Sequence, residues 1–264
     1  MNRTHERQKI LDSLSDNRRT ELGGDSPVVL SAEGVTKRFG GVQAVQDVSV
    51  TVRAGEIVSL IGPNGAGKTT LFNMLAGSLK PDAGTIILNG EDVTRTSELI
   101  RARKGLARSF QLVESFETMT TRQTLVVASL LRNDLAGAQR RASELLDTLG
   151  LDDVAERVPS ELALPAAKLL ELGKCLATSP KVLLLDEVMS GLTLAEAERP
   201  MKILRELSAN GMGILLTEHV MPIVMQLSDR VFVMSFGKEL AAGSPTEVLK
   251  NEQVLSAYLG GPVE

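Results

Sequence analysis

The chain has 264 residues, enough for one large domain or two small ones, and a formal net charge of −4. A negative balance gives no basic field for DNA or RNA, so we expect no nucleic-acid partner. The single cysteine, Cys175, excludes an internal disulfide and is expected to be a small buried residue in a reducing compartment. No apolar run approaches the roughly 18 residues that cross a bilayer, and residues 1–16 lack an apolar signal region. We therefore expect a cytoplasmic protein that reaches a membrane only through a partner.

The predicted elements divide the chain into an extension and a folded part. Residues 1–26 are rich in charge and poor in apolar side chains, which is typical of a flexible or weakly helical extension outside any core. Beyond it, apolar runs rich in β-branched residues predict strands. The expected strands are 45–52, 57–61, 85–88, 182–185, 214–217 and 231–234. The expected helices are 68–79, 123–132, 138–149, 167–177 and 195–208.

The order of these elements predicts the fold class. Strands that alternate with helices favour an α/β fold in which helices cover both faces of a mainly parallel sheet. The stretch from about 96 to 165 is mostly helical and interrupts the series of strands. It predicts a helical subdomain inserted into the α/β core.

A complete phosphate-loop pattern lies between the expected strand 57–61 and the expected helix 68–79. The pattern G-x-x-x-x-G-K-[ST] and the residue after it comprise Gly62, Pro63, Asn64, Gly65, Ala66, Gly67, Lys68, Thr69 and Thr70. Glycines let successive backbone N–H groups point at one anion, and the helix N-terminus adds positive charge. Lys68 can reach the β- and γ-phosphates, and the Thr69 hydroxyl can ligate Mg²⁺. The pattern predicts ATP binding, because an incidental glycine-rich turn would not combine this loop with both flanking elements.

Two acids follow the buried strand 182–185. Asp186 is placed to hold Mg²⁺, and Glu187 could polarise the attacking water as a general base. An Asp-Glu pair after a strand is also typical of helix N-capping. Beside a complete phosphate loop, the pair favours the catalytic interpretation.

The two histidines stand in different contexts. His5 lies in the polar extension, where no role is expected. His219 follows the strand 214–217, which we expect beside the Asp186 strand. Open α/β sheets bind ligands at the carboxyl ends of their strands. His219 could therefore contact the γ-phosphate, hold the attacking water, or simply be a surface histidine near the start of a helix.

The order of these motifs, with Gln111 between the loop and the acids, resembles that of the ABC ATPase family over about residues 28–260. The resemblance implies a P-loop NTPase core over 27–260 with an N-terminal antiparallel β part and the inserted helices. It also implies that Phe39 stacks on adenine, with a core residue as the less favoured alternative for a lone aromatic. Gln111 matches the family's glutamine loop, which links Mg²⁺ and the attacking water to the membrane partner.

Three stretches, 108–111, 185–192 and 256–260, are similar to those of branched-chain amino acid uptake ATPases. The similarity implies an ATP-hydrolysing subunit of an importer for branched-chain amino acids or a related small solute. Its implied partners are transmembrane permease subunits, a second ABC ATPase subunit and, indirectly, a solute-binding protein. The expected location is the inner face of the cell membrane.

The chain departs from the family at the signature sequence Leu-Ser-Gly-Gly-Gln. The corresponding stretch here is 162–166, Leu-Ala-Leu-Pro-Ala. In the family, the serine and the adjacent amides grip the γ-phosphate held by the opposite subunit. Ala163 has no hydroxyl and Pro165 has no N–H. A second departure is Thr193, which replaces an acid that helps to couple the two sites of the family.

Two other functions compete with a transport ATPase. A soluble ABC ATPase of DNA repair or translation is disfavoured, because this chain has a single cassette, no heptad run and a negative charge. A regulatory nucleotide-binding subunit with little hydrolysis of its own remains an alternative, because the altered signature has lost donors to the phosphate.

Overall fold

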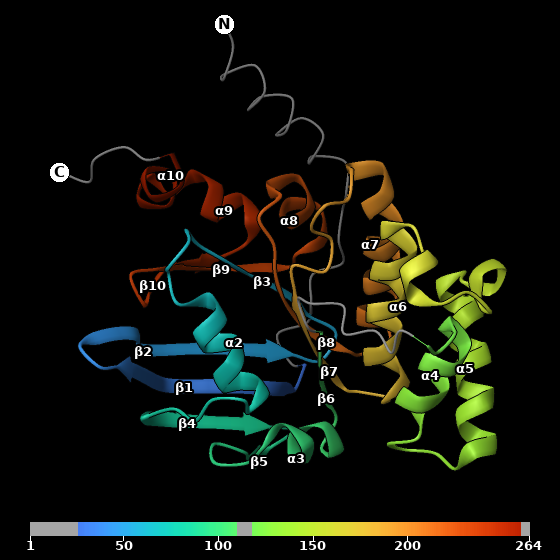
Figure 1. Cartoon of the computed structure of the whole chain (residues 1–264). Helices are drawn as coiled ribbons and strands as arrows, with labels where there is room; N and C mark the ends of the chain where they lie inside the picture. The colour runs from blue at the N-terminus through green and yellow to red at the C-terminus, as the bar shows by residue number, and fades with distance from the viewer. Residues whose placement is uncertain (1–25, 110–117, 260–264) are drawn as a thin grey trace, which may run out of the picture.

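The computed structural model describes residues 26–109 and 118–259, with side chains as far as residue 256. Gln111 and nearly all of the predicted extension therefore lie outside the described residues. Two β-sheets form in the described part, one antiparallel and one mainly parallel (Figure 1). The predicted α/β class, with its N-terminal antiparallel part, is confirmed.

The antiparallel sheet has the strand order β2-β1-β4-β5. Its strands are β1 (Val28–Phe39), β2 (Val42–Arg53), β4 (Ala83–Leu88) and β5 (Glu91–Asp92). No strand was expected at β1. Its pairing with β2 is broken by register shifts, including one between Ala32 and Val35, and these irregularities disturb the alternation that marks a strand.

The second sheet has the order β10-β9-β3-β8-β7-β6. Its strands are β3 (Ile57–Ile61), β6 (Leu106–Arg108), β7 (Val182–Asp186), β8 (Gly213–Thr217), β9 (Arg230–Ser235) and β10 (Lys238–Gly243). All pairs are parallel except β9 with β10. Every residue of β3, β7 and β8 is buried. Continuous apolar runs are what a strand covered on both faces needs.

Helices cover both sheets. They are α2 (Lys68–Ala76), α3 (Glu98–Arg103), α4 (Thr121–Ser129), α5 (Leu135–Leu149), α6 (Leu164–Ala177), α7 (Leu194–Ala209), α8 (Met221–Leu227), α9 (Pro245–Lys250) and α10 (Glu252–Leu259), with two short 3₁₀ turns at Asp152–Val154 and Pro159–Glu161. In Figure 1, α4, α5 and α6 gather on the side away from the antiparallel sheet. None of the helices within the described residues is long and apolar enough to cross a membrane.

The boundaries of the predicted helical subdomain, 96 to 165, stay a prediction. Within that stretch, β6 pairs with β7 and so belongs to the six-stranded sheet. The mutually packed helices α4, α5 and α6 extend from Thr121 to Ala177. The short β6 carries too few residues to show a strand pattern in the sequence.

A buried arginine fixes the far end of the helix that follows the phosphate loop. Arg101 of α3 is fully buried and donates to the carbonyls of Met74 and Leu75, each at 2.6 Å, at the end of α2. It also donates to the Val93 carbonyl at 2.6 Å. Burial lowers the pKa of this guanidinium to about 10, which leaves it charged at neutral pH. A cation at the C-terminus of a helix donates to the last carbonyls of the helix and interacts favourably with the negative end of the helix dipole.

Candidate functional site

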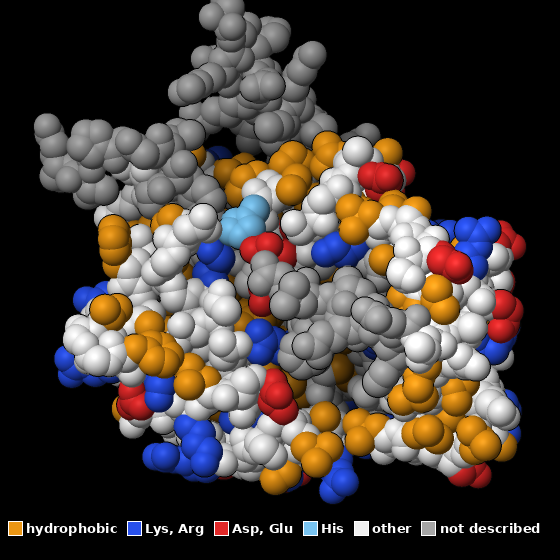
Figure 2. Space-filling view, viewed as in Figure 1, with side chains coloured by type: hydrophobic (Ala, Val, Ile, Leu, Met, Phe, Trp, Pro, Cys, Tyr) orange, Lys and Arg blue, Asp and Glu red, His pale blue; other side chains and the backbone are white. Residues whose placement is uncertain are grey.

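One cavity of 520 Å³ collects most of the residues that the sequence singled out. Those that line it are Asn64, Gly65, Ala66, Gly67, Lys68, Thr69, Thr70, Asp186, Glu187 and His219. They come from the loop after β3, from the first turn of α2, and from the carboxyl ends of β7 and β8 with the residues that follow them. Figure 2 shows a histidine with acidic and basic side chains gathered near the centre of one face.

The curl of the phosphate loop requires its glycines. Gly62 and Gly67 have φ angles of 152° and 100°. A Cβ at Gly62 would lie 2.2 Å from the Met234 carbonyl oxygen, and one at Gly67 would lie 2.3 Å from the Ala44 oxygen. Any other residue would push the loop away from these backbones. The glycines therefore serve close backbone approach as well as turn geometry.

Lys68 is the cation at the floor of the cavity. Its Nζ donates to the loop's own carbonyls, at 2.7 Å to Gly62 and 3.1 Å to Pro63. Burial lowers the pKa of Lys68, and the nearby negative charges of Glu187 and Asp186 oppose that shift. Gly62 and Pro63 thus hold the lysine, although neither lines the cavity.

Asp186 is held by residues at the carboxyl ends of the two strands beside β7, which are β6 and β8. Its Oδ1 accepts from the Thr217 hydroxyl at 2.6 Å, and its backbone N–H donates to the Ser109 hydroxyl at 2.9 Å. The Arg108 guanidinium lies 3.6 Å from Oδ2. Arg108 also donates to the Asn73 side chain of α2 at 2.7 Å. These contacts orient the carboxylate toward the cavity and connect it to α2.

Glu187 occupies a strained turn directly after β7. Its φ of 50° is in the left-handed region that bulky residues avoid. The Glu187 N–H donates to the Thr217 carbonyl and hydroxyl, both at 3.1 Å, and its Oε1 lies 2.8 Å from Nε2 of His219. The Lys168 ammonium of α6 donates to the Glu187 carbonyl at 3.4 Å. Such support is what keeps a strained residue in place.

Sequence reasoning missed Thr217 and Glu218, which directly precede His219. Glu218 is only 2% exposed, and its Oε1 accepts from the Met189 N–H at 3.0 Å. Burial raises the pKa of Glu218. Three successive residues at the end of β8 thus hold the turn that carries Glu187. A charged residue beside the histidine, after an apolar strand, is the signal that could have found Glu218.

The oxygen donors in the cavity suit Mg²⁺. This ion prefers oxygen ligands, keeps several waters and is usually bound by one or two carboxylates together with phosphate oxygens. The Asp186 carboxylate and the Thr69 hydroxyl line the same cavity and provide such a donor set. Gln111, the third predicted ligand, lies outside the described residues.

Phe39 does not line the cavity. It is 50% exposed at the end of β1 and pairs with Val42, which does line it. The Lys37 ammonium lies 5.8 Å from the centroid of the Phe39 ring. The predicted stacking of Phe39 on adenine stays a prediction.

The altered signature begins helix α6. Ala163 is the N-cap residue and makes no side-chain capping bond, and Pro165 occupies the first turn. Leu164 is 47% exposed. A helix start normally offers several free N–H groups and a capping hydroxyl. This one presents fewer donors to an anion than a Ser-Gly-Gly sequence would.

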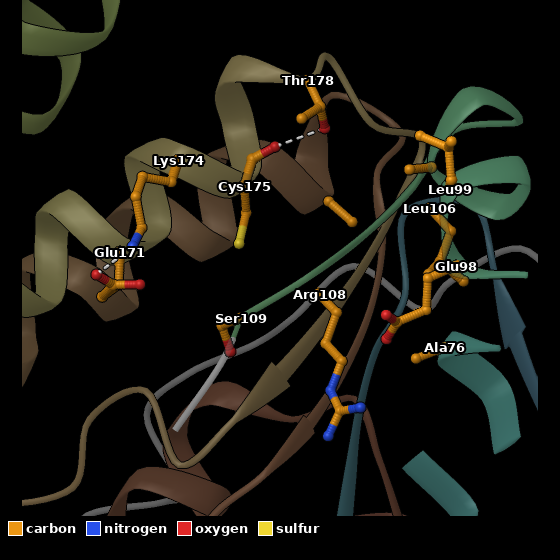
Figure 3. Close-up of a pocket in the computed structure, with 12 residues that line it drawn as sticks. Ala76, Glu98, Leu99, Leu106, Arg108, Ser109, Glu171, Lys174, Cys175 and Thr178 are labelled. Carbon is orange, nitrogen blue, oxygen red and sulfur yellow. Dashed lines mark hydrogen bonds and ion pairs between the residues drawn. The ribbon is translucent and has the colours of Figure 1, made fainter. Parts of the chain in front are cut away.

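A second cavity, of 440 Å³, lies between α3, β6 and α6 (Figure 3). Leu99 and Leu106 give it apolar surface, and Arg108 and Ser109 of the Asp186 network also line it. On its α6 side, Lys174 pairs with the buried Glu171 at 2.6 Å. The same wall holds the buried Cys175, whose pKa burial raises to about 12, so the thiol is not reactive at neutral pH.

The family model described as ABC transporter matches residues 45–190, which include the phosphate loop and the acid pair. The high-affinity branched-chain amino acid transport ATP-binding protein LivG of Salmonella typhimurium is 40% identical over 252 residues, covering 89% of this chain and 99% of LivG. This chain belongs to the ABC transporter ATP-binding family. It is accordingly an ATPase subunit of that family.

Further comparisons support the cassette's fold and refine its position in the family. The ADP conformation of MJ1267, an ATP-binding cassette of an ABC transporter, matches with a TM-score of 0.82 and 29% identity, covering 89% of this chain and 100% of that one. The lipopolysaccharide export system ATP-binding protein LptB of Escherichia coli is 35% identical over 233 residues, covering 88% and 97%. A model for branched-chain amino acid ATP-binding cassette transporters matches residues 238–264. A purely regulatory subunit is not favoured by these relatives.

Glu218 provides a test of how the cassette positions Glu187. Glu218→Leu should lower the kcat of ATP hydrolysis roughly tenfold to a hundredfold, because Glu187 is the predicted general base and small misplacements of such a group have effects of that size. The KM for ATP should change little, because Glu218 does not line the cavity around Lys68. Glu218→Gln keeps an acceptor for the Met189 N–H and should stay close to native. Equal kcat values in the Leu and Gln variants would exclude the positioning role.

Proposed function

We propose that this chain binds Mg²⁺-ATP in the cavity around Lys68 and that its ATP hydrolysis drives the import of branched-chain amino acids or a related small solute. The main support is the convergence of the phosphate loop, Asp186, Glu187 and His219 on one cavity. The similarity to LivG and the C-terminal family match favour this class of solute. We further propose that the chain sits on the cytoplasmic face of the membrane, attached to permease subunits that work with a solute-binding protein.

The proposed reaction is in-line attack of water on the γ-phosphate. The bond from the γ-phosphorus to the oxygen of the departing ADP breaks as the new P–O bond forms. The Lys68 ammonium and the loop amides stabilise the charge on the phosphate oxygens. When bound, Mg²⁺ supplies further neutralisation of that charge, and Thr69 and Asp186 are its proposed protein ligands together with Gln111.

Glu187 and His219 act together on the attacking water. The Glu187 carboxylate accepts a proton from water as general base. With Nε2 protonated, His219 donates to Glu187 Oε1 across the observed 2.8 Å and so fixes the carboxylate. The strained backbone of Glu187 and its bonds to Thr217 restrict where the carboxylate can point.

The chemical role of Glu187 can be tested directly. Glu187→Gln should retain ATP binding but slow hydrolysis by about a hundredfold or more, the usual scale for losing a general base. Steady-state phosphate release in the assembled transporter measures the rate, and ATP should hold the two nucleotide-binding subunits together for longer. Native turnover would assign the base to another group, with His219 the first alternative.

The altered signature favours a second, different ATPase subunit as the partner. In an ABC dimer each ATP lies between one subunit's phosphate loop and the other's signature. A homodimer of this chain would place Ala163 and Pro165 at both ATP molecules, where the loss of a transition-state donor typically lowers the rate about 10²–10³-fold. A partner with an intact signature would complete the site at Lys68 and Glu187. One competent and one weak site would result.

Expression of this chain alone, and then with a sister ATPase and permeases, tests the asymmetric dimer. We expect slow hydrolysis by the isolated chain and rapid hydrolysis by the complete assembly. In that assembly, Glu187→Gln in this chain should stop turnover, and the equivalent change in the sister should have a smaller effect. Rapid hydrolysis by the pure homodimer would show that the 162–166 stretch works without a Ser-Gly-Gly donor set.

We also propose that a permease segment docks in the cavity of Figure 3. Leu99 is 54% exposed there and offers apolar contact, while Glu98 and Lys174 offer charges for a segment of mixed character. The cavity connects to the ATP site through Arg108, which lines the cavity and lies 3.6 Å from Asp186. Movement of a docked segment could thus be transmitted to the nucleotide site through the Arg108 side chain.

Leu99→Asp should separate ATP binding from attachment to the permeases. The isolated variant should bind ATP as the native chain does, because Leu99 does not line the nucleotide cavity. Its assembly with permeases, measured by co-purification, should be weakened, because a charge replaces apolar contact surface. Leu135→Asp is the matched control, because Leu135 is 59% exposed on α5 and lines neither cavity. Equal co-purification of both variants would place the docking surface elsewhere.

A further inference from the structure

The hairpin between β9 and β10 contains an unexpected residue. Phe236 and Gly237 form its two-residue loop, with Ser235 paired to Lys238 across the strands. Their φ angles are 48° and 77°, the sign pattern of a type I′ turn. Asn, Asp and Gly are favoured at the first position of this turn, because bulky L-residues are strained there. The local geometry therefore gives no reason for a phenylalanine.

Burial does not explain it either. Phe236 is 88% exposed, so its ring gains nothing from the core. A residue that is unfavourable for its local backbone geometry and gains no buried contacts is expected mainly at functional sites. The position of the turn supports that expectation, because Phe236 lines the same cavity as Lys68 and Glu187.

The turn is fixed against the phosphate loop. The Gly237 N–H donates to the Ala66 carbonyl at 3.0 Å, and the Gly237 carbonyl accepts from the Gln46 N–H at 2.7 Å. A Cβ at Gly237 would lie 2.9 Å from the Ala44 oxygen. Phe236 is thus carried on a backbone joined to both the loop and β2. The backbone that carries the ring is therefore held at the edge of the cavity.

Two kinds of surface line this cavity. The phosphate loop and Lys68 supply N–H groups and an ammonium that suit phosphates, and the ends of β7 and β8 supply the carboxylates that suit Mg²⁺. Apart from Ala66 of the loop, the apolar side chains come from the neighbouring β2 and the hairpin, as Val42, Ala44 and Phe236. Val42 is itself 68% exposed. A nucleotide has the complementary construction, with charged phosphates at one end and a flat aromatic base at the other.

We propose that Phe236 is a base-binding residue, whose ring contacts the purine face of the nucleotide beside Val42 and Ala44. The proposal rests on the proposed ATP binding in this cavity, and it adds the residue that recognises the aromatic base. Stacking on an aromatic side chain stabilises a bound base and needs no hydrogen-bond code. Phe39, paired with Val42 at the end of β1, can approach the same base from the hairpin between β1 and β2.

Calorimetric titration of the full chain with ATP and with inorganic tripolyphosphate tests the proposal. Phe236→Asn removes the ring but suits the turn, so the melting temperature should stay level or rise. Its affinity for ATP should fall about tenfold, the scale of losing one stacked base, and its affinity for tripolyphosphate should not change. Phe236→Tyr should bind ATP like the native chain. Leu135→Asn, a change at an exposed leucine outside the cavity, should leave both affinities as they are.

Three results would overturn the role of Phe236. The first is native ATP affinity in Phe236→Asn. The second is an equal loss of ATP and tripolyphosphate affinity. The third is loss of ATP-dependent dimerisation while the ATP affinity stays native, which would assign the ring to a contact with a second subunit. Failure of the underlying ATP site is a different outcome. In that case the native chain would bind neither ligand, or Lys68→Ala would bind both with native affinity.

Discussion

The parallel pairing of β7 with β8 is the contact on which the site depends. Its register sets Asp186 opposite Thr217, so the residues after both strands emerge at one edge of the sheet. Thr217, Glu218 and His219 then each contact a different part of the segment from Asp186 to Met189. A slip of one residue would turn every side chain of β8 to the opposite face. Such a slip would also separate the Thr217 hydroxyl from the Asp186 carboxylate that accepts from it.

β3 completes the arrangement from the other side. It lies between β8 and β9 in the sheet and leads into the phosphate loop. The loop approaches Met234 at the end of β9 and Ala44 of β2 so closely that only glycine fits at Gly62 and Gly67. Lys68 therefore enters a cavity already shared with Asp186 and Glu187. The hairpin that carries Phe236 is joined to this loop by backbone bonds, which explains how a residue far along the chain reaches the same cavity.

Negative charge in the cavity is balanced by cations from two elements. The Arg108 guanidinium lies near Asp186, and Lys68 lies close to both Asp186 and Glu187. A bound polyphosphate would add negative charge to this group, and the loop amides are the matching donors. The signature segment at the start of α6 offers no hydroxyl at Ala163 and no N–H at Pro165. Under the proposed function, the described residues thus include an ammonium, loop amides and carboxylates around one cavity, whereas the start of α6 offers few donors to a second ATP.

The sequence alone predicted the mainly parallel sheet and the phosphate loop, because buried strands are continuous apolar runs and a loop between a strand and a helix needs its glycines in order. It also singled out Asp186, Glu187 and His219, which the structure places on one cavity. Only the tertiary structure showed that Glu218 holds Met189, that Arg108 reaches Asp186 and that Phe236 lines the cavity. It also showed β1, whose register shifts disturb its pattern. Each of these depends on contacts between distant segments. Such contacts leave no period in the sequence, because their residues meet only after the strands have paired.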